Sequence, residues 1–393
     1  MNDNKKPSIR FKGFTEAWEQ RKLGDCFTER VESMPEGELI SVTINDGIKK
    51  FSELGRHDNS NDDKSKYKKV CIGDIAYNSM RMWQGASGYS PYEGIVSPAY
   101  TVLSPNLGIN SKCLAYQFKM PEMIHTFQVN SQGITSDNWN LKYPAFSQIE
   151  IFVSKYEREQ AQIAEYFEKL DNLITLHQRK YDKLVNVKKS MLEKMFPRDG
   201  KNVPEIRFAG FTEAWEQRKL GEVFKEYSEK NYEELPPLMI VQGGGTQPRD
   251  ESDRSLMYDR ANLSNYKMVK EGDFIVHLRS FEGGLEMATN TGIISPAYHT
   301  LHGENTDSRF YYSYFRSKKF IDTDLKPHVY GIRDGRSIDI AGMKTINIPY
   351  TNFAEQKAIG DYISAVDNLI TLHQREVEKL QNIKKSCLEK MFV

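Results

Sequence analysis

The chain has 393 residues and carries 54 basic and 54 acidic side chains, so its formal net charge is zero. This balance argues against a protein that coats nucleic acid by bulk electrostatics, and any contact with a polyanion would depend on local basic patches. No apolar run approaches the roughly 18–20 residues of a membrane span, the N-terminus is polar, and the four cysteines show no CxxC spacing. We therefore expect a cytoplasmic protein without a disulfide framework or a zinc site.

Two segments of the chain occur twice. The lead-in PSIRFKGFTEAWEQRKLGDCF at 7–27 returns at 204–224 with 17 of 21 positions identical, and 171–196 returns at 367–392 with 20 of 26 identical. The middles between them share little beyond a Gly-Asp pair and a Ser-Pro-Ala-Tyr sequence. Internal repeats of this kind indicate tandem units. The ends predict one symmetric frame, whereas each middle would present a different surface to a different target.

Each middle has the pattern of an α+β body. In the first, strand-like segments are followed by helical character and a polar glycine-containing loop, and then by a short strand before the long helix. The second repeats this order. The predicted strands are 39–44, 72–78, 100–103 and 149–153, then 238–242, 273–278 and 345–348; the helical stretches are 111–128 and 309–321; the polar loops are 131–140 and 328–337.

A heptad pattern begins at Glu157 and predicts a coiled-coil seam that the second repeat retains. Helices of about 35–40 residues would be roughly 50–60 Å long, too long to pack entirely on one small body. The short linker at 197–203 favours antiparallel neighbours, with the bodies at opposite ends and a pseudo-twofold axis between them. The two seam histidines are expected to specify register. The central seam positions are Leu170, Ile174, His177, Tyr181 and Leu184, with Val366, Ile370, His373, Val377 and Leu380.

This pattern predicts a domain order along the chain. The first body occupies 1–156 and the first spacer helix 157–196, followed by the linker at 197–203. The second body occupies 204–352 and the second spacer helix 353–393. The expected fold is therefore α+β, with two globular α/β bodies joined by a long antiparallel two-helix coiled coil.

Catalytic signatures are missing from the sequence. It contains no GxSxG, HExxH, P-loop or GxGxxG, and the glycines at 243–245 are followed by Thr246-Gln247-Pro248 instead of the Lys-Ser/Thr of a phosphate cradle. The Asn/Asp-Pro-Pro-aromatic motif that amino-methyltransferases use is also missing, and the eight histidines show no ligand spacing. We therefore expect no catalysis, metal or cofactor on this chain.

The loops of both bodies instead mix amide, guanidinium and aromatic groups. Arg fits guanine and Asn or Gln fits adenine as bidentate partners, each worth about 1–3 kcal/mol of discrimination, and Lys, Ser and Thr hold phosphates. Candidate DNA-binding residues in the first body are Lys49, Lys50, Asn78, Arg81, Gln84, Gln132, Thr135, Asn138 and Asn140. In the second they are Gln242, Gln247, Arg249, Arg279, Tyr330, Arg333 and Arg336.

Taken together, the chain resembles the specificity subunit of a bacterial type I restriction-modification enzyme. The resemblance covers almost the full length and rests on the order of parts: a lead-in containing Trp18 or Trp215, a variable body, and helices that start with Glu159-Gln160 or Glu355-Gln356. It implies two target-recognition domains that read an asymmetric bipartite double-stranded DNA target across an unread spacer. No base-contact signature is carried over from the family, so the candidates above rest on residue chemistry alone.

The resemblance also implies partners that perform the chemistry. Two modification subunits would methylate adenine with S-adenosylmethionine, and two restriction subunits would use ATP and Mg. The repeated helices and lead-ins would dock the two identical modification subunits. Two other interpretations remain open: an adaptor that displays two protein-binding modules, and a tandem enzyme of unfamiliar type with an acid/base pair in each body.

Overall fold

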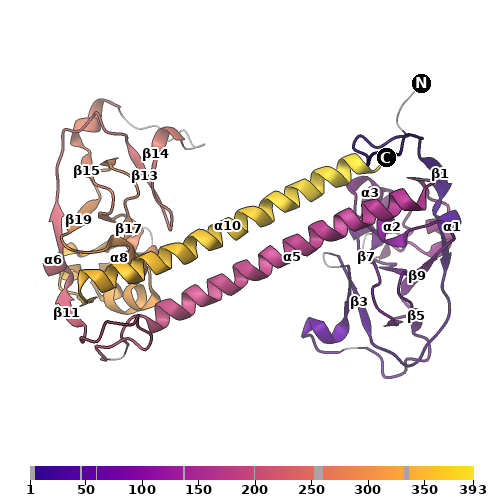
Figure 1. The fold of residues 1–393 in the computed structure, drawn as a ribbon, viewed down its shortest axis with the longest axis horizontal. Helices are drawn as coiled ribbons and strands as arrows, with labels where there is room; N and C mark the ends of the chain where they lie inside the picture. Colours follow the sequence, from indigo (N-terminus) through magenta and orange to yellow (C-terminus); the bar gives the residue numbers. More distant parts are fainter. Residues whose placement is uncertain are drawn as a thin grey trace. The chain divides into compact units, whose positions relative to one another are not determined.

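The computed structural model describes residues 5–44, 47–58, 60–135, 138–198, 200–251, 260–331 and 336–393. It divides into two compact units, unit 1 with Met1–His177 and Arg375–Val393, and unit 2 with Gln178–Gln374. Each unit therefore contains one body and one part of each long helix (Figure 1). In the ranges described, no helix combines the length and apolar character that crossing a membrane requires.

Unit 1 is built on a four-stranded antiparallel sheet in the order β2-β9-β6-β7. The central strand β6 is buried on both faces, which explains its continuous apolar sequence. Hairpin β3-β4 and pair β5-β8 form separate two-stranded sheets, as does β1 with β10. The elements are β1 Glu19–Lys22, α1 Leu23–Cys26, β2 Phe27–Glu29, β3 Ile40–Thr43, β4 Gly47–Lys50, η1 Phe51–Leu54, β5 Lys68–Val70, β6 Ile75–Asn78, η2 Met82–Gln84, β7 Ser87–Tyr89, β8 Gly94–Val96, β9 Tyr100–Pro105, α2 Ser111–Gln117, α3 Pro121–Val129, α4 Tyr143–Phe146, β10 Glu150–Val153 and α5 Glu157–Lys194.

Unit 2 repeats this topology, although its middle sequence is different. Its four-stranded sheet has the order β12-β19-β16-β17, and β13-β14, β15-β18 and β11-β22 form the matching pairs, with β20-β21 in addition. The elements are β11 Glu216–Lys219, α6 Leu220–Val223, β12 Phe224–Tyr227, β13 Leu238–Val241, β14 Gly245–Pro248, η4 Arg249–Glu251, η5 Arg260–Asn265, β15 Lys267–Val269, β16 Phe274–Val276, α7 Ser280–Gly283, β17 Glu286–Met287, β18 Gly292–Ile294, β19 His299–Gly303, α8 Ser308–Phe315, the π-helical η6 Lys319–Leu325, η7 Lys326–His328, β20 Val329–Tyr330, β21 Ser337–Ile338, α9 Ile340–Met343, β22 Asn347–Tyr350 and α10 Phe353–Met391.

Each body is closed by the end of the helix that starts in the other repeat. In unit 1 the ring of Phe392, after α10, meets Trp18 edge-on at 6.0 Å and stacks on Phe167 at 6.0 Å. In unit 2 the ring of Phe196, after α5, meets Trp215 edge-on at 5.8 Å. All these side chains are buried. The duplicated lead-in and the duplicated helix end therefore form one core in each unit.

The Glu-Gln pair at each helix start joins the helix to its body. The side chain of Glu159 is fully buried and pairs with Arg10 of the lead-in at 2.5 Å, and Glu355 pairs with Arg207 at 2.6 Å. The adjacent Gln160 accepts a hydrogen bond from the backbone N–H of Asn110, the N-cap of α2, at 2.8 Å. Gln356 does the same for the N-cap of α8 at 3.0 Å. Helices α2 and α8 are therefore fixed in equivalent places.

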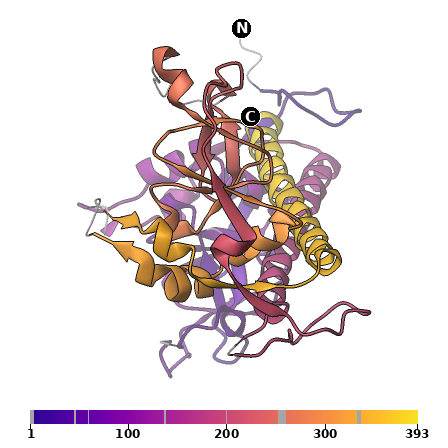
Figure 2. The same cartoon turned by 90° about the vertical axis from the view of Figure 1, so that its left-hand side faces the viewer.

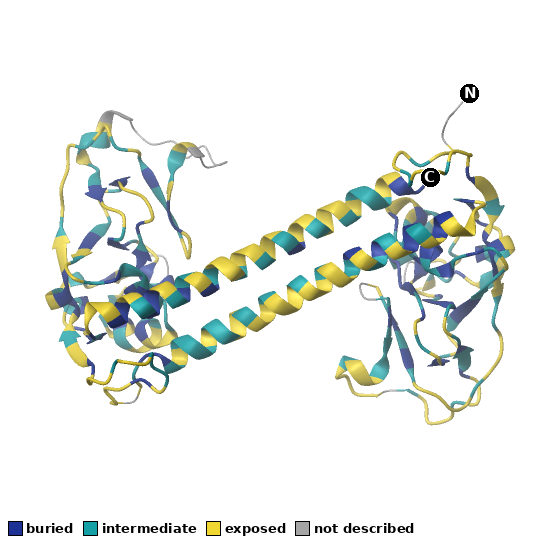
Figure 3. Cartoon of the chain, in the orientation of Figure 1, coloured by how far each residue is buried: buried dark blue, intermediate teal, exposed yellow. Residues whose placement is uncertain are grey.

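The predicted antiparallel helix pair is confirmed within the units. In unit 1, Tyr166 of α5 contacts Cys387 of α10, and Asp171 of α5 pairs with Lys384 of α10 at 2.5 Å. Residue numbers therefore rise along α5 where they fall along α10, as in an antiparallel pair. Unit 2 repeats that ion pair between Asp367 and Lys188 at 2.6 Å. Figure 2, which faces unit 2, shows the two helices side by side, and Figure 3 shows buried or half-buried positions recurring along both.

The ten predicted seam positions lie on the inner side of the helices. Leu170, Val366 and Val377 are buried. The remaining seven, Ile174, His177, Tyr181, Leu184, Ile370, His373 and Leu380, are half-buried. This distribution is typical of an isolated two-helix seam, which covers side chains from one side only.

Candidate nucleic-acid interface

A short helix with an exposed arginine at its N-cap follows the central strand of each sheet. In unit 1 the segment is Arg81-Met82-Trp83-Gln84-Gly85, and in unit 2 it is Arg279-Ser280-Phe281-Glu282-Gly283. The two arginines share an unusual backbone conformation, with φ −130° and ψ 12° at Arg81 and φ −113° and ψ 12° at Arg279. Both side chains are exposed, so the two predicted arginine contacts occupy equivalent exposed positions.

The polar loop before the last strand of each body packs on the aromatic residue of this short helix. In unit 1, Trp83 meets Trp139 edge-to-face at 5.2 Å. In unit 2, the guanidinium of Arg336 lies 4.3 Å above the ring of Phe281, and its Nη2 donates to Glu282 at 3.1 Å. The loop and the short helix, which are more than 40 residues apart in sequence, therefore form one surface in each unit.

A hairpin supplies the third part of the surface. In unit 2 the β13-β14 turn contains Gly243 and Gly245 in the left-handed region, with φ of 80° and 75°. The turn brings the side-chain amide of Gln242 against Gly283, where an added Cβ would collide with it. In unit 1 the β3-β4 hairpin carries the half-buried Lys49 and Lys50. We call the hairpin, the short helix and the polar loop of each unit its recognition surface.

Within unit 1 the other candidates divide into exposed and structural groups. Gln132, Thr135 and Asn138 are exposed, whereas Asn140 is half-buried, and its Oδ1 has no hydrogen-bond partner among the described residues. The backbones of Gln132 and Asn140 pair with each other at 2.9 and 3.0 Å, which closes the loop. The Oδ1 of Asn78 accepts from the backbone N–H of Met80 at 3.0 Å, so this side chain already has an internal role.

In unit 2 the remaining candidates are distributed more widely. Gln247 is exposed on β14, and Tyr330 of β20 is 59% exposed. The Nε of Arg249 donates to the carbonyl of Leu238 at 3.4 Å, a long hydrogen bond across the base of the hairpin. Arg333 lies outside the described residues. The structure therefore brings together Gln242, Arg279 and Arg336. Gln247 lies on the second strand of the same hairpin, Tyr330 lies in the polar loop, and Arg249 follows the hairpin.

Sequence reasoning missed a hollow of about 730 Å³ beside the unit 1 sheet. It is lined by Asn78 and Tyr100 of the sheet and by Arg56 and His57 of the segment after η1. Arg56 and His57 are exposed, and they belong to a polar stretch whose sequence has no periodic pattern. Only the fold, which brings this stretch beside β6 and β9, identifies them as candidates.

One titratable side chain beside the unit 2 recognition surface, His277, is kept neutral by burial. Burial lowers the pKa of His277, whose Nδ1 accepts from the backbone N–H of Arg279 at 3.3 Å. The imidazole is therefore neutral beside the arginine at neutral pH. Away from this surface, in the unit 1 core, burial raises the pKa of the Cys26 thiol to about 11, so this cysteine remains protonated. The described residues contain no group of three or more metal-ligating side chains.

This arrangement defines a class of protein: a tandem repeat that builds two related surfaces with different side chains on one shared frame. Comparison with protein families identifies the class. Residues 15–186 and 212–382 each match the family described as the type I restriction modification DNA specificity domain. The chain belongs to this family, and it is a type I restriction-modification specificity subunit with two DNA specificity domains.

Individual relatives agree with this assignment. The chain is 25% identical over 350 residues to the type I restriction enzyme MjaVIII specificity subunit of Methanocaldococcus jannaschii. This match covers 82% of this chain and 81% of the relative. It is 23% identical over 413 residues to the putative MjaX specificity subunit of the same organism, covering 95% and 92%. The crystal structure of the type I restriction-modification system S subunit from M. genitalium shares the fold, with a TM-score of 0.62, 15% identity and 99% of both chains covered.

Proposed function

We propose that each unit reads one half of an asymmetric bipartite double-stranded DNA target through its recognition surface. One observation carries this proposal: in each unit a hairpin, a short helix and a polar loop come together beside the four-stranded sheet, but their side chains differ between the units. Unit 1 offers Arg81, Gln84, Thr135 and Asn138, whereas unit 2 offers Gln242, Arg279, Tyr330 and Arg336. Because guanidinium and amide groups distinguish bases by their hydrogen-bonding edges, different sets select different sequences.

We further propose that the repeated helices dock two identical modification subunits. Leucine pairs at the same place in both repeats support this idea: Leu173 and Leu176 are 43% and 47% exposed, and Leu369 and Leu372 are 45% and 51% exposed. They lie in the sequence DNLITLHQR, which is identical in both copies. Exposed leucines that serve no internal core are typical of an interface, and their duplication provides two copies of it.

The chemistry would belong to these partners. Modification subunits with S-adenosylmethionine would methylate adenine, and two restriction subunits with ATP and Mg would complete a cytoplasmic complex. The specificity subunit would contribute target choice and geometry, with no catalytic group of its own. The modification subunits would also contribute part of the grip on the phosphates, which accords with the zero net charge of this chain.

A body exchange tests the reading of DNA. Residues 28–156 would be replaced with the corresponding middle of another specificity subunit, and the adenine methylome would be recorded in cells that also make the cognate modification subunit. We expect one half of the split motif to change and the other half to remain. A change in both halves of the motif, or in neither, would contradict the proposal that each unit reads one half-site.

A second experiment tests the docking. We expect the Leu173→Ser/Leu176→Ser variant to retain one modification subunit on co-purification, and the variant with serines at all four leucines to retain none. Leu107→Ser is the matched control, because Leu107 is fully exposed but lies outside the repeats. Undiminished binding by the fourfold variant would exclude this face as the docking site.

A further inference from the structure

A basic side chain occupies the same place in both units and ties the hairpin of each recognition surface to a neighbouring element. Lys119 comes one residue after the C-cap of α2, and Arg316 is the C-cap of α8. Each lies eight residues after the serine that begins its helix, Ser111 or Ser308. Both helices are fixed by the equivalent glutamines Gln160 and Gln356, so the two cations are structural counterparts although the surrounding sequences differ.

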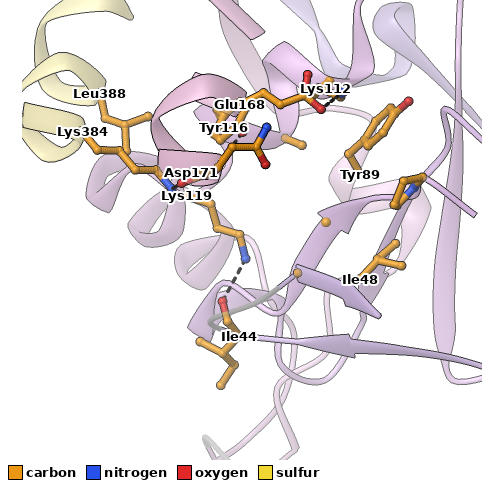
Figure 4. Close-up of a pocket in the computed structure, with 15 residues that line it drawn as sticks. Ile44, Ile48, Tyr89, Lys112, Tyr116, Lys119, Glu168, Asp171, Lys384 and Leu388 are labelled. Atoms are coloured by element: carbon orange, nitrogen blue, oxygen red, sulfur yellow. Dashed lines mark hydrogen bonds and ion pairs between the residues drawn. The ribbon is translucent and has the colours of Figure 1, made fainter. Parts of the chain in front are cut away.

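In unit 1 the connection is direct. The Nζ of Lys119 donates to the backbone carbonyl of Ile44 at 3.0 Å and to that of Gly85 at 2.6 Å. Ile44 belongs to the β3-β4 hairpin beside its turn, and Gly85 is the C-cap of η2, the short helix that carries Arg81. Figure 4 shows Lys119 extending from the helix side of a cavity toward Ile44 on the hairpin. One ammonium group thus holds two of the three elements together.

In unit 2 the connection runs through a carboxylate. Arg316 forms an ion pair with Glu286, whose side chain is fully buried. Glu286 in turn accepts from the backbone N–H of Gly243, in the β13-β14 turn, at 2.7 Å. It also accepts from the hydroxyl of Tyr312 of α8 at 2.9 Å. The hairpin turn that presents Gln242 is therefore tied to α8. In unit 2 the hairpin contributes a backbone N–H to this connection, whereas in unit 1 it contributes a backbone carbonyl.

We propose that Lys119 and Arg316 are positioning residues that set the sequence discrimination of unit 1 and unit 2, respectively. Neither needs to touch a base. Lys119 ties its hairpin to the short helix, and Arg316 ties its hairpin to α8, so each fixes where a hairpin lies. Base discrimination depends on side chains that reach bidentate geometry. The inference rests on the proposed function, because it assumes that the recognition surfaces read DNA.

The adenine methylome of cells that make the chain with its modification subunit provides the test. We expect Lys119→Met to raise methylation roughly tenfold at sites with one wrong base in the unit 1 half-site, about what one good base contact supplies, and to leave the other half-site unchanged. Lys119→Arg should restore discrimination, because a guanidinium can also donate to two carbonyls. Lys112→Met is the matched control: Lys112 lies on α2, the helix that Lys119 follows, and lines the same cavity, but it contacts Glu168 and Tyr89.

The reciprocal experiment uses Arg316→Met, which should relax only the unit 2 half-site. Since this change leaves the buried Glu286 without its cation, Arg316→Met/Glu286→Gln is the alternative if the single variant does not fold. Relaxation of both half-sites by one variant, or unchanged discrimination in variants that melt as the wild type does, would overturn the inference. If the wild-type chain itself produced no split motif, the proposed function would fail instead.

Discussion

The exchange of helix ends makes a specific prediction about stability. Phe392 lies at the end of the second repeat but is buried in unit 1, against Trp18 and Phe167. Truncating a buried phenylalanine to alanine removes its transfer free energy and leaves a cavity, at a cost of about 3–5 kcal/mol. A typical domain is stable by only about 5–15 kcal/mol. We therefore expect Phe392→Ala to remove a large part of the stability of unit 1 and little of that of unit 2.

Hydrogen exchange monitored by mass spectrometry can resolve the two units. Peptides from β6 and β9 of unit 1 should lose protection, whereas peptides from β16 and β19 of unit 2 should keep it. Phe353→Ala is the matched control, because Phe353 begins the helix that Phe392 follows but is 49% exposed, and a surface change of this kind costs within about 0.5 kcal/mol. Loss of protection in β16 and β19, or no loss in either unit, would refute the placement of Phe392 in the core of unit 1.

A fragment of residues 1–198 should sediment as a dimer, because its 179–196 segment resembles the 375–392 segment that completes unit 1; a stable monomer would contradict this. Arg207→Met should cost about 3–5 kcal/mol in chemical unfolding, since it strands the buried Glu355 carboxylate, and Arg207→Met/Glu355→Gln should recover much of the loss. Burial lowers the pKa of Lys119 from 10.5 to about 8, with Lys384, itself paired to Asp171, adding to the effect. Between these two pKa values the unfolded chain holds a proton that the folded chain has lost. The free energy of unfolding of the wild type should therefore rise relative to that of Lys119→Met as the pH goes from 7 to 9.5. An unchanged difference would exclude a lowered pKa for Lys119.

Much of the architecture could be predicted because it depends on periodicity and repetition. The heptads from Glu157 fixed the start of α5, and the duplicated lead-in fixed the number of bodies. What the repeat could not reveal is which body Phe196 and Phe392 enter, because that depends on the pairing of the helices. The common sheet order of the two units was also hidden, since a buried strand requires only apolar side chains, and Ile75-Ala76-Tyr77 and Phe274-Ile275-Val276 satisfy this equally.

The recognition surface was predictable in composition but not in geometry. Residue chemistry indicated Arg81, Arg279 and Gln242, yet the contact of Gln242 with Gly283 joins positions far apart in sequence. Asn78 has the residue type of a base-reading group, but its amide oxygen caps its own loop. Lys119 gave no signal, because a single lysine after a helix is usually solvated and only the fold shows the two carbonyls that it binds.

The central claim is that this chain chooses the DNA sequence that its partners methylate. The most direct test compares the adenine methylomes of cells that make the modification subunit with and without this chain. We predict one split, asymmetric motif that appears only when the chain is present. If the two strains had the same methylome, although the strain with this chain makes both proteins, the result would contradict the account and favour a protein-binding adaptor.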